Sequence, residues 1–98
     1  TILGWAATAP PADVAFARDY LKLGGRQDWN WAMMDAAWQS PAELAVMQVQ
    51  DLLGLGHEAR MNTPSTLGEN WLWRLLPGEL TEDLAQTVRA RMARFGRL

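Results

Sequence analysis

Prolines and glycines divide this chain into short segments, and this division constrains the fold more than any other feature of the sequence. The first half of the chain contains three pairs of this kind, Pro10-Pro11, Gly24-Gly25 and Ser40-Pro41. Proline lacks a backbone N–H and disfavours helical backbone in the residue before it. Glycine adopts the left-handed backbone that ends many helices. Each of these pairs is therefore a boundary between elements, and only short helices fit between them.

Two helices are predicted between these boundaries, after a loop over residues 1–9. Pro10-Pro11 suits a first helical turn, and apolar side chains recur at helical spacing from Ala12 to Leu23. Gly24-Gly25 then ends the first helix. Asp28 is a suitable cap for a second helix that runs to Gln39, where Ser40-Pro41 stops it.

The segment 44–50 is expected to form a short buried strand, because its first residues would place apolar side chains on both faces of a strand. So short a run does not distinguish a strand from a helix by its period alone. Gly54 and Gly56 break any longer helix that would include it. From His57 to Leu76 the residues are typical of a long loop, and loops of this length are commonly functional.

The last helix has the clearest signals. Thr81 is a plausible N-cap, acidic residues follow it in the first turn, and Gly96 closes the helix. Its apolar stripe is expected to be buried and consists of Leu80, Leu84, Val88, Met92 and Phe95. The order of elements is helix, helix, strand, loop, helix, so the predicted fold class is mainly α with one or two short strands in a single segment, 1–98. Because one strand makes no sheet, either the chain is mostly helical by itself or the strand's partners lie outside it.

Composition excludes several classes of function. The 98 residues are 49% hydrophobic and 20% charged, with a net charge of −2 and no basic run. Nucleic acids and anionic membranes both require clustered Lys and Arg, so neither is an expected partner. No apolar stretch is long enough for a membrane span. The absence of cysteine excludes disulfides and thiolate metal sites and is compatible with a cytoplasmic protein.

No catalytic, metal-binding or cofactor-binding group is predicted within the chain. His57 is the only histidine, has no second metal ligand at helical spacing, and is expected to be an exposed loop residue. Glycoside chemistry needs two carboxylates at a defined separation. Asp51 follows the predicted strand, where α/β barrels place catalytic groups, but it has no visible partner and a loop-organising role is favoured.

Two segments of the long loop have the side chains that bind sugars, Arg60–Pro64 and Asn70–Arg74. Amide and guanidinium groups bond to hydroxyls, and aromatic rings cover the apolar faces of sugars. Trp71 and Trp73 are nevertheless expected to pack beneath the loop, with Arg74 paired locally. For Asn62 the pattern leaves two interpretations equally open: a polar contact, or a turn residue that tolerates left-handed backbone.

These segments resemble the C-terminal signature of 4-α-glucanotransferases of the amylomaltase type. The resemblance rests on residues 49–56 (VQDLLGLG), 59–64 (ARMNTP), 70–74 (NWLWR) and 93–97 (ARFGR), and residues 1–5 (TILGW) are similar to those after the family's His-Asp-x-x-Thr segment. Three positions depart from the family pattern. Gln48 stands where the family usually has proline, and Ser65 and Glu69 stand where it commonly has glycine. The loss of the two glycines is expected to change the conformation of the loop that carries Asn62.

The resemblance implies the C-terminal part of a (β/α)₈ barrel enzyme that transfers α-1,4-glucan segments by retaining double displacement. It implies that the catalytic carboxylates lie outside these 98 residues and that Asn62 contacts bound sugar. We therefore expect the chain alone to be inactive and, with an apolar surface left uncovered, to self-associate. The alternative is a stand-alone, non-catalytic helical module that binds α-glucan or another protein.

Overall fold

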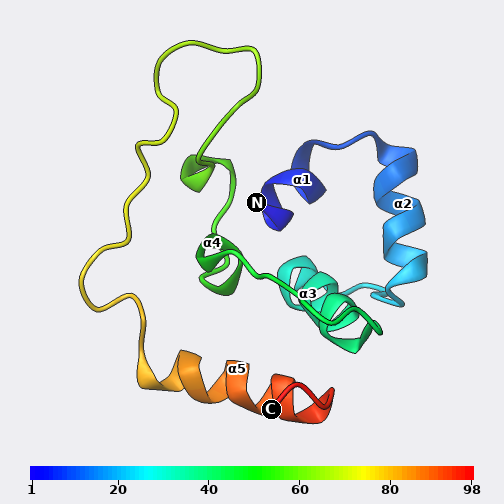
Figure 1. Ribbon diagram of the computed structural model, residues 1–98. Coiled ribbons are helices and arrows are strands. Elements are labelled where there is room, and N and C mark those ends of the chain that lie inside the picture. The colour runs from blue at the N-terminus through cyan, green and yellow to red at the C-terminus, as the bar shows by residue number, and fades with distance from the viewer.

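A computed structural model describes all residues, 1–98, and contains helices but no strand (Figure 1). The elements are α1 (Ile2–Thr8), α2 (Pro11–Tyr20), α3 (Trp29–Gln39), α4 (Val49–Leu52), a 3₁₀ turn η1 (His57–Ala59) and α5 (Glu82–Arg94). The mainly α class is confirmed. The radius of gyration is 14.7 Å, against about 13 Å for a compact domain of this length. The chain is therefore more open than a self-contained domain.

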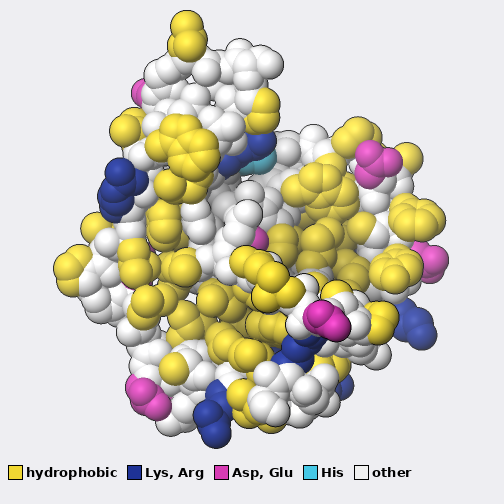
Figure 2. Space-filling model, viewed as in Figure 1, with side chains coloured by type: hydrophobic (Ala, Val, Ile, Leu, Met, Phe, Trp, Pro, Cys, Tyr) yellow, Lys and Arg dark blue, Asp and Glu magenta, His cyan; other side chains and the backbone are white.

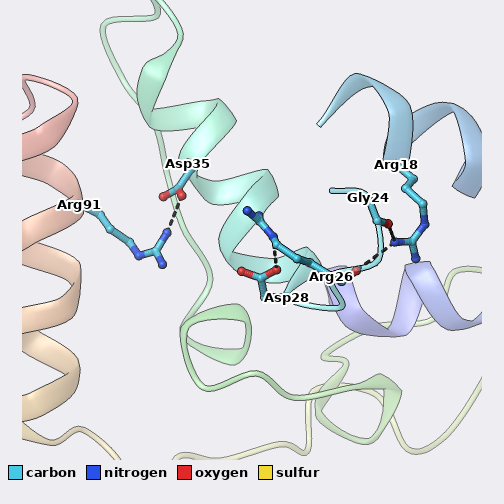
Figure 3. A network of polar contacts seen from close by, with 6 residues as sticks. All are labelled: Arg18, Gly24, Arg26, Asp28, Asp35 and Arg91. Atoms are coloured by element: carbon cyan, nitrogen blue, oxygen red, sulfur yellow. Dashed lines mark hydrogen bonds and ion pairs between the residues drawn. The ribbon is translucent and has the colours of Figure 1, made fainter. Parts of the chain in front are cut away.

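The core lies between α1, α2 and α3. Leu23, Trp29 and Ala32 form its buried cluster. Trp5 of α1 packs edge-on against Trp29, with ring centroids 6.1 Å apart. The guanidinium of Arg18 lies 4.9 Å from the same Trp29 ring and bonds to backbone carbonyls of the α2–α3 connection (Figure 3). This pair of tryptophans therefore has a structural role in the core.

Three helices end in the same hydrogen-bonding arrangement, the Schellman motif, in which a left-handed residue follows the last turn. Gly96 closes α5 in this way, as the sequence predicts, and Gly54 closes α4. In α2 the left-handed residue is Lys22, with φ +54°, where Leu23 N–H donates to the Arg18 carbonyl. The helix therefore ends at Tyr20, three residues before the predicted Leu23.

The prediction of a loop over residues 1–9 is wrong, because Ile2–Thr8 form α1. Two oxygen atoms satisfy the first N–H groups of this helix. Thr1 Oγ1 accepts from Gly4 N–H at 3.1 Å, and Asp51 Oδ1 accepts from Ile2 N–H at 2.7 Å. The second acceptor lies 49 residues away in the sequence, so no local pattern could reveal it.

The prediction of a strand over 44–50 is also wrong. Residues 44–48 are irregular, Leu44 and Val46 are exposed, and Val49–Leu52 form the single turn α4. A strand needs a neighbouring strand to take up its backbone N–H and carbonyl groups, and the 98 residues contain none. The order of elements is therefore four α-helices, a long irregular segment and a fifth helix.

Helix α5 lies apart from α1 and α2 (Figure 1), and polar contacts attach it and the residues after it to α3. Thr81 Oγ1 accepts from Leu84 N–H at 3.1 Å, which confirms the predicted cap. Arg91 pairs with Asp35 of α3 at 2.5 Å (Figure 3), and Arg97 donates to carbonyls at the C-terminal end of α3. The apolar stripe is only half-buried and Leu80 is exposed, so its predicted burial is wrong.

Hydrophobic side chains cover much of the face shown in Figure 2, around α2 and in the region between α4 and α5. The region between α4 and α5 contains an apolar groove of about 410 Å³, formed by Leu52, Leu80, Leu84, Val88, Met92 and Leu98 with three neighbouring residues. None of the helices has both the length and the apolar character that crossing a membrane requires.

Candidate substrate-binding cavity

A cavity of about 690 Å³ lies where α1, the start of α4, the turn η1 and the long loop meet. It is lined by polar and aromatic side chains and contains no carboxylate; the lining residues are Thr1, Trp5, Thr8, Gln48, Gln50, His57, Arg60, Met61, Asn62 and Trp71. Amide, guanidinium and aromatic groups together suit a neutral, hydroxyl-rich ligand. The cavity thus brings Asn62, singled out by the sequence, together with groups from four separate segments.

The turn η1 is held in place by α4 beneath it. The buried Gln50 side chain donates from Nε2 to the Ala59 carbonyl at 3.2 Å, and Ala59 is fully buried. At the start of the turn, Gly56 N–H donates to the Glu58 carboxylate at 2.8 Å. This hydrogen bond, with smaller contributions from the Glu58 N–H and from His57, lowers the pKa of Glu58 below its usual value.

His57 fixes the same turn against α1. Its Nε2 lies 2.9 Å from Thr8 Oγ1. Because the single hydroxyl proton of Thr8 is donated to the Gly4 carbonyl, His57 Nε2 is the donor in this pair. A Cβ at Gly4 would lie 2.8 Å from His57 Nδ1, so glycine is required for this close approach. His57 is exposed, as predicted, but it also joins the turn to α1.

Asn62 lies on the wall of the cavity and is exposed. Its backbone carbonyl accepts from Arg60 Nε at 2.8 Å, whereas its side-chain amide has no hydrogen-bond partner in the chain. Its backbone is not left-handed. The interpretation of Asn62 as a turn residue that tolerates left-handed backbone is therefore wrong, and its amide is available to a ligand.

The structure separates the two tryptophans of the loop. Trp71 is 61% exposed and lines the cavity, whereas Trp73 is half-buried and lies outside its wall. The expectation that both pack beneath the loop is wrong for Trp71. Arg74 pairs locally, as expected, because its Nη1 donates to the carbonyls of Trp71 and Trp73 at 2.9 and 2.8 Å. The sequence offered one sign that Trp71 lines a cavity, because the segment Asn70–Arg74 has the side chains that bind sugars.

Asp51 lies outside this cavity and is buried. One carboxylate oxygen accepts from Ile2 N–H, and the Asp51 carbonyl accepts from Asn30 Nδ2 at 2.7 Å. The carboxylate therefore completes the start of a helix, α1, where the sequence favoured a loop-organising role. No three metal-ligating side chains lie close enough together to hold a metal ion.

Comparison with known proteins places this arrangement in a family. The family model described as 4-alpha-glucanotransferase matches residues 1–81. The chain is 46% identical over 95 residues to the 4-alpha-glucanotransferase of Thermus thermophilus. This alignment covers 92% of the chain and 19% of that protein. It is 39% identical over 102 residues to the chloroplastic/amyloplastic enzyme of Arabidopsis thaliana, covering the whole chain and 18% of that protein.

A solved structure agrees with the sequence matches. Amylomaltase from Streptococcus agalactiae, in complex with acarbose, superposes with a TM-score of 0.90 at 25% identity, over 99% of this chain and 20% of that one. The chain therefore belongs to the 4-alpha-glucanotransferase family. It spans about a fifth of the length of the relatives it matches.

Proposed function

We propose that this chain is a segment of a 4-alpha-glucanotransferase and forms the C-terminal part of its (β/α)₈ catalytic barrel. The enzyme transfers α-1,4-glucan segments between maltodextrin acceptors by retaining double displacement. The observation that carries the proposal is the family match over residues 1–81. The helices of this segment then cover strands supplied by the rest of the polypeptide, which accounts for its open shape.

The contribution of this segment is one wall of the substrate cleft. A retaining glycosidase-type reaction needs two carboxyl groups about 5–5.5 Å apart, and the cavity wall formed here contains none. The wall instead supplies the unpaired amide of Asn62 and the guanidinium of Arg60. An amide both donates to and accepts from sugar hydroxyls, so Asn62 is the residue we assign to sugar binding.

The proposal is tested by comparing two polypeptides with maltotriose as the only substrate. The purified 98-residue chain is expected to release no glucose, because the two carboxyl groups are absent from its cavity. The polypeptide that includes the remaining four fifths is expected to release glucose and to form longer maltodextrins. Transfer by the 98 residues alone would contradict the segment proposal, and a full-length protein without transfer activity would contradict the proposed function.

Asn62→Ala and Asn62→Asp in the full-length enzyme test the assigned residue. Asn62→Ala removes both hydrogen-bonding atoms, and Asn62→Asp removes the donor only. We expect kcat/KM for maltotriose to fall by about tenfold or more for alanine, since each lost hydrogen bond to a neutral group is worth about 1 kcal/mol. Leu67→Ala is a control in the same loop, because Leu67 is fully exposed and lies outside the cavity wall. Unchanged kinetics for both Asn62 variants would refute the assignment.

A further inference from the structure

The loop beside Asn62 has an unusual density of left-handed backbone. Between residues 65 and 71, four positions have positive φ: Ser65 at +63°, Gly68 at +75°, Glu69 at +50° and Trp71 at +64°. For a bulky side chain such as tryptophan this conformation is a genuine outlier. Conformations of this kind persist only where the surrounding structure determines them, and they concentrate at functional sites.

The backbone around Trp71 is held from both sides. Its N–H donates to the Met61 carbonyl, in the segment that carries Asn62. Its carbonyl accepts from Arg74 Nη1 at 2.9 Å, and Arg74 Nη1 also donates to the Trp73 carbonyl at 2.8 Å. These contacts fix the direction of the Cα–Cβ bond of Trp71 and thus the side of the loop from which its ring projects.

The ring that this backbone presents makes little contact with the rest of the 98 residues. Trp71 is 61% exposed, whereas Trp29 and Trp38 are each 4% exposed. An exposed indole in a left-handed conformation has two free-energy costs. The backbone is strained, and the apolar surface of the ring is left in water. The ring lines the same cavity as Asn62 and Arg60. A ligand that covers the ring and bonds to these two polar groups accounts for all of these observations.

We propose that Trp71 is an aromatic platform on which one glucose ring of the α-1,4-glucan stacks beside Asn62, and that Arg74 is a positioning residue that holds Trp71 in its left-handed conformation. A pyranose ring has an apolar face of C–H groups and a rim of hydroxyls, so the face lies on the indole while the rim meets the amide. This inference rests on the proposed function.

Trp71→Gly separates a platform from a structural tryptophan. Glycine adopts a φ of +64° without a steric penalty, so removal of the ring relieves strain. In the full-length enzyme we expect an unchanged or higher melting temperature together with a KM for maltotriose raised about tenfold, the effect of losing one covered aromatic face. Trp71→Phe keeps a smaller platform and is expected to raise KM less. Trp73→Phe is the matched control with an unchanged KM.

Arg74→Met tests the positioning role, because methionine has an unbranched side chain with no N–H group to donate to the two carbonyls. We expect its KM to rise, and we expect no further rise when it is added to Trp71→Gly, since the two residues act through one ring. An active wild-type enzyme in which Trp71→Gly leaves KM unchanged would overturn the inference and leave the proposed function standing. A melting temperature lowered by Trp71→Gly would assign the ring a structural role and overturn it as well. Absence of transfer by the wild-type enzyme would instead overturn the proposed function.

Discussion

Replacing Ser65 and Glu69 by glycine is expected to stabilise the chain. Both residues have left-handed backbone, at φ +63° and +50°, in the loop that carries Asn62. These are the two positions at which the family pattern has glycine, so the loop keeps the conformation that glycine favours without having glycine there. Both side chains are exposed, and neither forms a hydrogen bond or ion pair in the structure. A substitution therefore removes strain and no contact.

The size of the effect is the difference between two opposing terms. A left-handed conformation costs a residue with a Cβ about 1–2 kcal/mol. Glycine also lowers the free energy of unfolding by about 0.4–1 kcal/mol, because it makes the unfolded chain more flexible. Each substitution is thus expected to raise the free energy of unfolding by about 0.5–1 kcal/mol, and the pair by about 1–2 kcal/mol if the two sites are independent. The melting temperature of a domain of this size rises by about 4–8 °C per kcal/mol.

Equilibrium unfolding in urea measures this difference at a fixed protein concentration. Leu67→Gly is the matched control, because Leu67 lies between the two sites, is fully exposed and does not have positive φ. This substitution relieves no backbone strain and only increases the conformational entropy of the unfolded chain. It is therefore expected to lower the free energy of unfolding by about 0.4–1 kcal/mol. If Ser65→Gly and Glu69→Gly destabilise the chain as much as Leu67→Gly does, the strain argument is refuted.

Three further predictions follow from the contacts of the helices. Arg91→Ala should lower the free energy of unfolding by about 2 kcal/mol in urea titrations, because it leaves the half-buried Asp35 carboxylate without its partner; an unchanged value would refute this. As pH falls below 4.5, wild type should lose more stability than Glu58→Gln, because a lowered pKa means that protonation breaks the bond from Gly56; parallel curves would contradict it. We also predict that the 98-residue chain self-associates through the groove between α4 and α5 and that Val88→Glu weakens this association; a wild-type monomer in concentrated solution by light scattering would refute it.

Much of the helical structure could be predicted from local sequence, because its causes are local. Pro11 begins α2, Thr81 caps α5, and Gly96 closes it through hydrogen bonds within a few residues. The predicted second helix also ends at Gln39. For the site, residue type and family pattern indicated Asn62, and the cavity does contain it. Its contact with sugar stays a prediction that the kinetic variants must test.

Contacts between distant residues decided the rest. Helix α1 depends on the Asp51 carboxylate, and the apolar run before α4 remains irregular because no strand lies beside it. The sequence alone thus determined where α2 begins, where α3 ends, where α5 begins and ends, and which family the chain belongs to. The tertiary structure decided that Trp71 faces the cavity, because the hydrogen bonds of Arg74 and Met61 hold a backbone conformation that tryptophan does not prefer by itself.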